Sequence, residues 1–284
     1  SFGSLPQSAL LMVEVVSDNE CLRQDLLLWS AWTPKCPKTH ASHMPDIQIR
    51  KTEAIAALHD LEDESFDAVI TDPPYSSGGL HRKNRTKSAS EKYSKAANRD
   101  ELNFDGDMRD QRSFVAWCSV WMHECWRVTR PGGVMAVFTD WRQLPVTTDA
   151  VQAGGWIWRG IVPWDKGLGT RPRIGGFRAQ AEYVVWASRG ELPQKPEVGA
   201  LPGAFACTIK RSDRHHLTGK PTELMREIVK VCPPGGRILD PFAGSGTTLV
   251  AAALEGRGAL GFELSSNYVA ATEGRLGELR ASAP

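Results

Sequence analysis

The segment Thr71-Asp72-Pro73-Pro74-Tyr75 places an acid, two prolines and a ring directly after a short apolar run, residues 68–70. A carboxylate only accepts hydrogen bonds at neutral pH, and a proline offers a carbonyl oxygen without an N–H. Because the two prolines have a fixed φ, the carbonyl of Pro73 keeps a set direction, and Tyr75 presents a flat face. We therefore predict a site for a planar base, whose exocyclic amino group donates to Asp72 and to the carbonyl of Pro73.

This arrangement suits the transfer of a methyl group to an aromatic amine. Such an amine is a poor nucleophile, because its lone pair is delocalised into the ring. Two acceptors on its hydrogens favour a pyramidal nitrogen, and Asp72 can stabilise the positive charge that develops there and take the proton. Since a duplex buries its amino groups, the base must flip out, at a cost of about a few kcal/mol. The predicted catalytic residues are Asp72, Pro73, Pro74 and Tyr75.

A second strand-ending acid, Asp240, introduces a loop of small residues. Gly244 and Gly246 allow a tight turn and the close approach of a ligand, and Glu263, at the end of the next strand, can accept hydrogen bonds from ribose hydroxyls. The loop is neither G-x-G-x-x-G nor a loop with G-K-[ST], so it suits a nucleoside without phosphates, such as S-adenosylmethionine, better than NAD or ATP. A tight turn without a ligand is the alternative. The predicted cofactor-binding residues here are Asp240, Pro241, Phe242, Ala243, Gly244, Ser245, Gly246, Thr247 and Glu263.

Alternating strands and helices from residue 45 onward position these two segments. Strands are predicted at 47–50, 66–72, 134–140, 155–165, 181–190, 235–240 and 258–264, and helices at 52–61, 110–128, 220–232 and 248–257. This pattern predicts an α/β fold with a mostly parallel sheet and helices on both faces. The tryptophan stripe of 110–128 is interpreted as core. Because parallel strands share a carboxyl edge, we expect Asp72 and the glycine loop to lie side by side.

At these residues the sequence resembles the circularly permuted β class of DNA amino-methyltransferases. The resemblance covers about residues 46–280, and its motifs occur in the β-class order. The similar segments are TDPPY (71–75), the catalytic motif; HLTGKPTELMREIV (216–229), with His216, Lys220 and Pro221; DPFAGSGTT (240–248), the cofactor loop; and GFELSSNYV (261–269), the ribose-binding strand.

The resemblance implies a Rossmann-like seven-stranded sheet with one antiparallel strand. It implies S-adenosylmethionine as the cofactor, with Lys220, Pro221 and Asp72 among the residues that bind it. It also implies methylation of adenine N6 in a specific DNA sequence, because Asp-Pro-Pro-Tyr usually accompanies adenine-N6 and Ser-Pro-Pro more often cytosine-N4 methylation. Where relatives often carry an acid after glycine upstream of the motif, this chain reads Lys51-Thr52-Glu53, so Glu53 is expected to substitute.

The domain organisation follows from the extent of these patterns. Residues 1–44 show no sustained period and are interpreted as an N-terminal appendage, and residues 45–284 as the catalytic domain. There is no long separate target-recognition domain, so residues 164–215 are the candidate target-recognition region. Residues 76–112 form a basic loop after the catalytic motif.

Double-stranded DNA is the expected partner, bound through local clusters of basic residues. The net charge of +1 gives no bulk argument for a polyanion, but three segments are locally basic. Contacts with phosphates are expected there, with solvated loops as the alternative. The candidate DNA-binding residues are Arg82, Lys83, Arg85, Lys87, Arg171, Arg173, Lys210 and Arg211.

Other features limit the remaining possibilities. Six scattered cysteines without a C-x-x-C pair predict reduced thiols and no metal site. No apolar run approaches the roughly 20 residues of a membrane span, so we expect a cytoplasmic protein, nucleoid-associated in a prokaryote or phage-infected cell. A homodimer and a cognate restriction endonuclease are possible partners. The open alternatives are a cytosine-N4 methyltransferase, a methyltransferase for RNA or a protein amide, and a non-catalytic DNA-binding module; a carbon-5 cytosine enzyme is disfavoured because the Pro-Cys pair of that family is absent.

Overall fold

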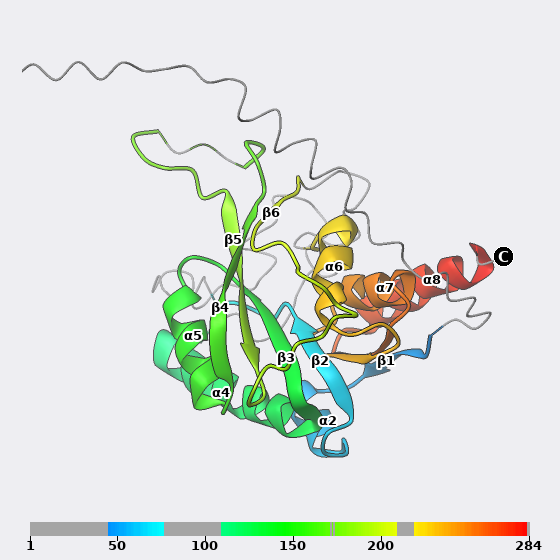
Figure 1. Cartoon of the computed structure of the whole chain (residues 1–284). Helices are drawn as coiled ribbons and strands as arrows, with labels where there is room; N and C mark the ends of the chain where they lie inside the picture. Colours follow the sequence, from blue (N-terminus) through cyan, green and yellow to red (C-terminus); the bar gives the residue numbers. More distant parts are fainter. Residues whose placement is uncertain (1–44, 77–108, 171, 173, 209–218, 283–284) are drawn as a thin grey trace, which may run out of the picture. The chain divides into compact units, whose positions relative to one another are not determined.

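A computed structural model describes residues 45–76, 109–170, 172, 174–208 and 219–282, all within the compact unit His43–Pro284. Its centre is a single mixed sheet in the order β1-β8-β7-β2-β3-β5-β4-β6 (Figure 1). The strands are β1 (Ile47–Lys51), β2 (Phe66–Thr71), β3 (Thr129–Thr139), β4 (Ile157–Asp165), β5 (Ala181–Ser188), β6 (Phe205–Ala206), β7 (Arg237–Asp240) and β8 (Gly258–Glu263).

Strand directions confirm the predicted mostly parallel sheet. The five strands from β1 to β3 in the sheet order run parallel to one another, and β5 is antiparallel to both of its neighbours, β3 and β4. Seven strands were expected, but the described sheet has eight. The extra strand, β6, forms because the chain after β5 returns to the edge of β4, where the Cys207 N–H donates to the Asp165 carbonyl (3.0 Å).

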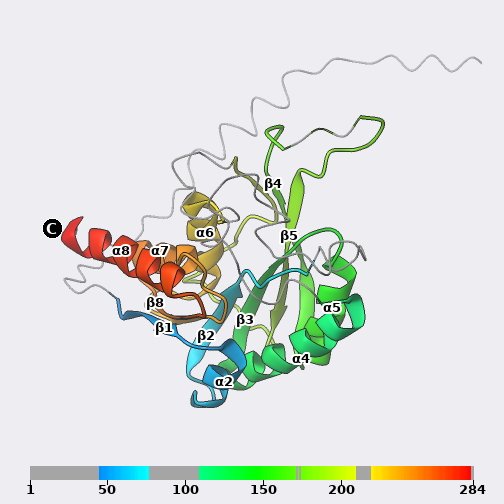
Figure 2. The same ribbon diagram turned by 180° about the vertical axis from the view of Figure 1, so that it is seen from behind.

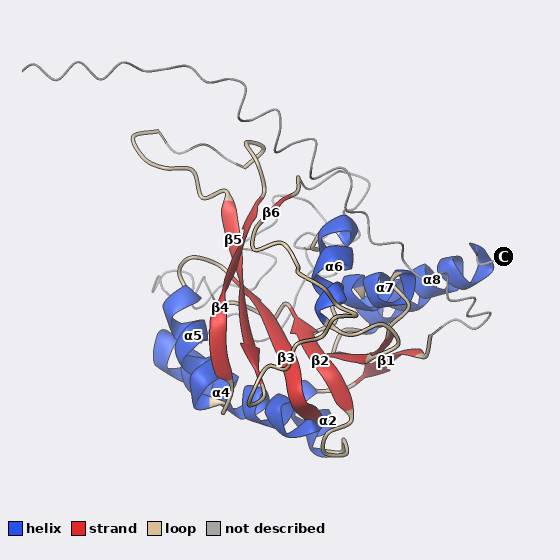
Figure 3. Cartoon of the chain, viewed as in Figure 1, coloured by secondary structure: helices blue, strands red, loops and turns tan. Residues whose placement is uncertain are grey.

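Helices cover both faces of the sheet, as predicted (Figures 2 and 3). One layer consists of α2 (Ala54–His59), α4 (Gln111–Val128) and α5 (Leu144–Ala153); the other consists of α6 (Thr222–Ile228), the short 3₁₀ helix η5 (Val229–Val231), α7 (Thr247–Leu254) and α8 (Ser266–Ser282). Alternation along β2 serves both cores, since Val69 packs toward the first layer and Ala68 and Ile70 toward the second. The sequence analysis did not predict α5, α8 or β6.

Helix α4 carries the tryptophan stripe. Asp110 caps its N-terminus by accepting from the Ser113 N–H (2.9 Å). Trp121 and Cys125 are fully buried in the first core, which confirms the core interpretation for them. Trp117, in contrast, is only partly buried, and it lines the cavity described below.

The predicted helix 110–128 and strand 134–140 leave the segment Arg130-Pro-Gly-Gly133 as a connection between two elements. Instead β3 already begins at Thr129, and its register against β2 moves from the pair Phe66–Thr129 to the pair Ala68–Val134. The additional residues form an irregularity within β3, where Gly132 has a φ of 73°. Residues 130–133 therefore belong to β3, where they shift its register against β2, and they do not separate two elements.

Candidate active site

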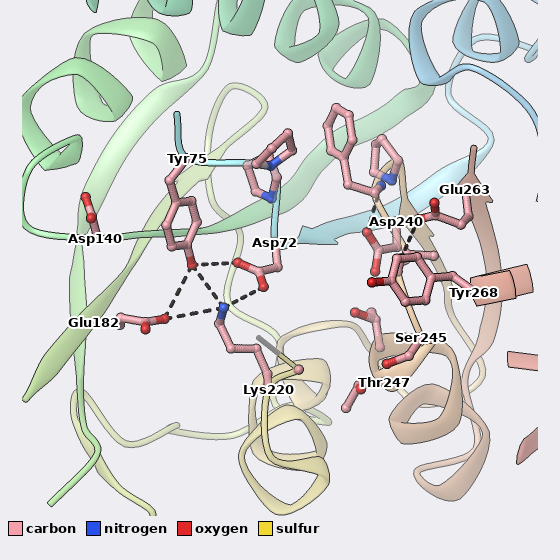
Figure 4. A pocket seen from close by; sticks show the side chains of 18 of the residues that line it. Asp72, Tyr75, Asp140, Glu182, Lys220, Asp240, Ser245, Thr247, Glu263 and Tyr268 are labelled. Atoms are coloured by element: carbon pink, nitrogen blue, oxygen red, sulfur yellow. Dashed lines mark hydrogen bonds and ion pairs between the residues drawn. The ribbon is translucent and has the colours of Figure 1, made fainter. Parts of the chain in front are cut away.

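Four adjacent parallel strands end in acids at one edge of the sheet. Glu263 ends β8, Asp240 ends β7, and Asp72 and Asp140 directly follow β2 and β3. All four side chains line a single cavity of about 830 Å³ (Figure 4). The prediction that the catalytic segment and the glycine loop meet is thus confirmed. A buried hydrogen bond joins the two strands, from Thr71 Oγ1 to Asp240 Oδ1 (2.7 Å).

The glycine loop is held by the acid at the end of β8. Glu263 accepts from the Gly244 N–H (3.0 Å) and from the Ser265 N–H (2.8 Å). Gly246 caps α7 with a φ of 75°, and a Cβ there would lie 2.3 Å from Thr272 Cγ2 in α8. Glycine is therefore required at position 246 for its left-handed backbone and for the close approach of α8.

Aromatic rings form the wall near this loop. The ring of Phe242, which follows the cofactor-loop acid, lies 5.4 Å from that of Trp117 and 5.1 Å from that of Trp121. The Arg109 guanidinium stands 4.2 Å from the centre of the Trp117 ring. Phe242, Trp117 and Tyr268 line the cavity and offer aromatic surface for a heterocycle beside the carboxylate of Glu263.

At the other end of the cavity, four polar side chains form a connected group, which we call the Asp72 network. Its members come from separate parts of the chain: Asp72 and Tyr75 after β2, Glu182 on β5 and Lys220 before α6 (Figure 4). The Tyr75 hydroxyl donates to Asp72 Oδ1 (2.5 Å), and Lys220 Nζ donates to Asp72 Oδ2 and to the Tyr75 hydroxyl (3.0 Å). Lys220 Nζ also pairs with Glu182 Oε2 (3.3 Å).

Burial and charge set the protonation states of this network. Burial raises the pKa of Asp72 above its usual range, although the positive charge of Lys220 opposes the shift. Burial and the neighbouring Asp72 raise the pKa of Tyr75 well above its usual value, so it remains a phenol. Burial alone would lower the pKa of Lys220, but Asp72 and Glu182 raise it, so it remains an ammonium.

The acids at the glycine-loop end are also perturbed. Burial raises the pKa of Asp240 to about 6, against hydrogen bonds from Thr248 and Thr71 that lower it. Burial also raises the pKa of Glu263, opposed by the backbone N–H groups of Ser265 and Gly244. A bound group that carries positive charge or donates hydrogen bonds would therefore stabilise the ionised forms of Asp240 and Glu263.

Most of the predicted site residues line the cavity. These are Glu53, Asp72, Pro73, Pro74, Tyr75, Lys220, Asp240, Pro241, Phe242, Ala243, Gly244, Ser245, Thr247 and Glu263. Gly246 packs behind this lining against α8, and Pro221 is the N-cap of α6. The Glu53 carboxylate caps α2 by accepting from the Ala56 N–H (2.8 Å), a structural role that the sequence analysis did not assign.

The predicted DNA-binding residues lie outside the described residues. This holds for Arg82, Lys83, Arg85, Lys87, Arg171, Arg173, Lys210 and Arg211, and also for His216. Their role in binding DNA stays a prediction. Lys166, in the same basic segment as Arg171 and Arg173, lies at the cavity instead, where its Nζ pairs with Glu182 (2.9 Å).

Sequence reasoning missed several cavity residues. Glu182 was included in a predicted strand, and a signal was present, because it is a charged residue beside the apolar run that continues through Val184 and Val185. Asp140 repeats the strand-ending pattern of Asp72 and Asp240. The next residue, Trp141, is 53% exposed at the cavity, and the Arg142 guanidinium lies 4.9 Å from its ring.

Within the described part of the chain, no group of three His, Cys, Asp or Glu side chains could hold a metal ion, and the four cysteines there are free thiols. Among the same residues, no helix combines the length and the apolar character needed to cross a bilayer.

The chemistry of the cavity fits S-adenosylmethionine. A ribose supplies hydroxyl donors for the carboxylate of Glu263, and an adenine ring suits the wall of Phe242 and Trp117. The positively charged sulfur and amino group of that molecule suit the acids Asp240 and Asp72. The cavity volume of about 830 Å³ lies in the upper part of the range of about 300–1,000 Å³ that is common for small-molecule sites.

Known structures share this fold. The chain resembles the M1.HpyAVI–SAM complex with a TM-score of 0.59 at 21% identity, covering 81% of this chain and 98% of that one. It also resembles the cytosine-N4-specific PvuII DNA methyltransferase with a TM-score of 0.62 at 18% identity, covering 82% and 89% of the two chains. At these identities the likeness establishes the α/β architecture.

Sequence relatives and a family model go further. The chain is 30% identical over 213 residues to YubD of Escherichia coli (strain K12), which covers 75% of this chain and 82% of the relative. It is 27% identical over 258 residues to the type II methyltransferase M.HinfI of Haemophilus influenzae, covering 82% and 68%. The family model N6_N4_Mtase, described as DNA methylase, matches residues 66–202 and 205–274. The cavity therefore belongs to a member of the N6_N4_Mtase family of DNA methylases.

Proposed function

We propose that the protein methylates the exocyclic N6 of adenine in a specific sequence of double-stranded DNA, after flipping the target base into the cavity. Membership of the family makes the chain a DNA methyltransferase that uses S-adenosylmethionine. The choice of adenine rests on the acid of the Asp72-Pro73-Pro74-Tyr75 segment, which in the family usually accompanies adenine-N6 methylation.

The observation that carries the proposal is the shared cavity of the catalytic segment and the glycine loop. Asp72 and Asp240 end neighbouring strands, and Thr71 bridges them. A methyl donor on the loop and an amine at Asp72 would therefore be held within one enclosure, which replaces a bimolecular encounter by proximity. The cavity also has two distinct ends, one with Glu263 and Phe242 and one with Asp72 and Tyr75.

At the catalytic end, each residue has a chemical task. When bound, S-adenosylmethionine supplies a methyl group on a positively charged sulfur. Asp72 and the Pro73 carbonyl accept the two amine hydrogens, and the Tyr75 ring stacks on the base. The Asp72 oxygens already accept from Tyr75 and Lys220, but a carboxylate has about four lone-pair sites and can take a further donor. The lone pair of the amine nitrogen would form the new N–C bond as the S–C bond to the methyl group breaks, which leaves the sulfur as a neutral thioether. Asp72 stabilises the positive charge that develops on the nitrogen and then accepts its proton.

At the cofactor end, we assign binding to the glycine loop, Glu263 and the aromatic wall. Gly244 and Ser245 line the cavity, and Glu263 accepts from the ribose. Asp240 faces the positive charges of the cofactor. Glu53 lines the same end of the cavity while it caps α2.

DNA is proposed to approach the side of the cavity near the β4–β5 connection. The base of this connection lines the cavity at Lys166 and Ala179, and the connection projects beyond the strands (Figure 1). Two of its apolar side chains, Ile174 and Phe177, are both 101% exposed. Apolar side chains on a projecting element can enter between bases and unstack them, which would assist flipping.

The test uses the full chain, S-adenosylmethionine labelled in its methyl group and duplex DNA of mixed sequence. Digestion to nucleosides and chromatography should place the label in N6-methyladenine, and Asp72→Ala should abolish the product. The matched control is Asp149→Ala, at an exposed acid on α5 outside the cavity lining, which should keep the wild-type rate.

Other products would overturn the proposal at separate points. Label only in N4-methylcytosine would reject adenine as the base. Label in RNA or protein, but not in DNA, would reject the substrate class. Cofactor binding without turnover on any DNA would support a non-catalytic DNA-binding module.

A further inference from the structure

Lys220 has all its hydrogen-bonding capacity engaged around Asp72. The side chain is 7% exposed, and an ammonium has three donors. Three acceptors surround Nζ: Asp72 Oδ2, the Tyr75 hydroxyl (3.0 Å) and Glu182 Oε2 (3.3 Å). These contacts account for every donor of Lys220. The buried ammonium of Lys220 is therefore paired with the carboxylates of Asp72 and Glu182 at this end of the cavity (Figure 4).

Glu182 holds Lys220 in that position. It projects from β5, and its two oxygens pair with different lysines: Oε1 with Lys166 (2.9 Å) and Oε2 with Lys220. The single proton of the Tyr75 hydroxyl is donated to Asp72, and this hydroxyl lies 3.4 Å from Glu182 Oε2, so Lys220 is the group that bridges Glu182 to Asp72. The two acids and two lysines together carry no net charge, which lowers the cost of their burial.

We propose that Lys220 and Glu182 are positioning residues for the catalytic acid: Lys220 keeps Asp72 ionised and oriented, and Glu182 keeps Lys220 on Asp72. This assigns Lys220 to the acid rather than to the cofactor, which the sequence resemblance had implied. The inference rests on the proposed role of Asp72 as acceptor for the amine. It assigns Glu182 on β5 and Lys220 before α6 to the group of residues that allow Asp72 to accept the proton.

Lys220 and Glu182 act on the pKa of Asp72 in opposite directions. Burial raises the pKa of Asp72, Lys220 lowers it and Glu182 raises it further. The other charged groups at the cavity edge are Asp140 after β3, Asp240 at the end of β7, and Lys166 on the far side of Glu182. Because an unprotonated Asp72 is required for transfer, the rate falls on the acid side as Asp72 becomes protonated.

The experiment measures the single-turnover rate of methyl transfer as a function of pH. Lys220→Met should move the acid limb to higher pH by about 1–3 units, since an opposite charge at this distance is lost. Glu182→Gln removes a negative charge near Asp72 but keeps an amide oxygen as an acceptor for Lys220, so it should move the same limb to lower pH. Glu182→Ala removes the acceptor as well and should reduce the plateau rate, because Lys220 is then held less firmly. Lys166→Met, which removes a lysine that pairs with Glu182 but not with Asp72, is the matched control and should shift the limb less than Lys220→Met.

Cofactor affinity, measured by calorimetry, separates this role from the one that the resemblance implies. The affinity of Lys220→Met for S-adenosylmethionine should stay within about twofold of wild type. A large loss of affinity with an unmoved acid limb would overturn the inference and make Lys220 a cofactor ligand. Shifts of the same sign for Lys220→Met and Glu182→Gln would also overturn it.

Folding and the proposed function are controlled separately. If Lys220→Met does not fold, the double variant Lys220→Met/Glu182→Gln removes one charge of each sign and leaves the net charge of the network unchanged. Its acid limb should lie at higher pH than that of Glu182→Gln, because the positive charge of Lys220 is lost, and a limb at the same or lower pH would contradict the assigned charges. If Asp72→Asn retains the wild-type rate, the proposed role of Asp72 fails. If Asp72→Asn is inactive while Lys220→Met leaves the limb unmoved, only the present inference fails.

Discussion

Asp240→Asn should make the protein more stable at neutral pH while weakening its hold on the cofactor. Asp240 is 2% exposed at the end of β7, and its Oδ1 accepts from Thr71 Oγ1 (2.7 Å) and from the Phe242 N–H (3.1 Å). An asparagine with its oxygen in the same place can keep both bonds. Its NH2 group donates where the carboxylate of Asp240 accepts from Thr248, and a hydroxyl can accept as well as donate, so the main change is the inability to ionise.

The size of the effect follows from linkage. Burial raises the pKa of Asp240 from 3.8 to about 6. The difference of about 2 units, at about 1.4 kcal/mol per unit, corresponds to about 3 kcal/mol. Because the folded state binds this proton more tightly than the unfolded state, the contribution is present below about pH 4 and is lost as the pH rises through about 6. The free energy of unfolding of Asp240→Asn should thus exceed that of wild type slightly at pH 4 and by about 3 kcal/mol at pH 8.

Urea unfolding at pH 4.5, 6 and 8, followed by tryptophan fluorescence, measures this difference. Asp149→Asn, at the exposed acid on α5, is the control, whose difference from wild type should not grow with pH in this way. Calorimetry should show wild-type affinity for S-adenosylmethionine rising through about pH 6, as the carboxylate ionises, and a flat, weaker affinity for Asp240→Asn. A variant less stable than wild type at pH 8, or a gap independent of pH, would refute the reasoning.

Substitutions at three further positions test the geometry of the cavity. Gly246→Ala should lower the free energy of unfolding in urea by about 2–4 kcal/mol, since the φ is 75° and the added Cβ would lie 2.3 Å from a side-chain carbon of α8. The control is Gly256→Ala, which has a φ of 70° and no neighbour within 4 Å and should lower it by only about 1–2 kcal/mol. Equal losses at the two positions would contradict the packing argument. Thr71→Val should lower the free energy of unfolding by about 1–3 kcal/mol. It should also move the pH dependence of cofactor binding to higher pH, because the hydrogen bond from Thr71 lowers the pKa of Asp240. An unchanged binding profile would count against that bond. Tyr75→Phe should keep the flipped-base signal of 2-aminopurine fluorescence, whereas Tyr75→Ala should weaken base capture by about ten- to a hundredfold; equal loss in both would show that the hydroxyl, and not the ring, matters.

Much of the fold and both ends of the cavity were predictable from local signals. Short apolar runs that stop at Asp72 and Asp240 predicted strands with polar carboxyl ends, and the parallel α/β pattern placed those ends on one edge. The conformations at Gly246 and at the two prolines are local properties of the residues. The strand count was wrong by one, since a two-residue strand such as β6 forms only where a neighbouring edge is available.

The Asp72 network, in contrast, depends on contacts between distant segments. Lys220 lies 148 positions from Asp72, and Glu182 reaches it only because β5 runs antiparallel beside β3 and turns its acid toward the cavity. Trp117 has the same helical spacing as its buried neighbours, yet it lines the cavity beside Phe242. The residues and their spacing therefore establish the chemistry and the shared edge. The partners of each charge, and hence the protonation states of the site, come from the three-dimensional packing, because burial and electrostatic pairing depend on distances that no sequence spacing specifies.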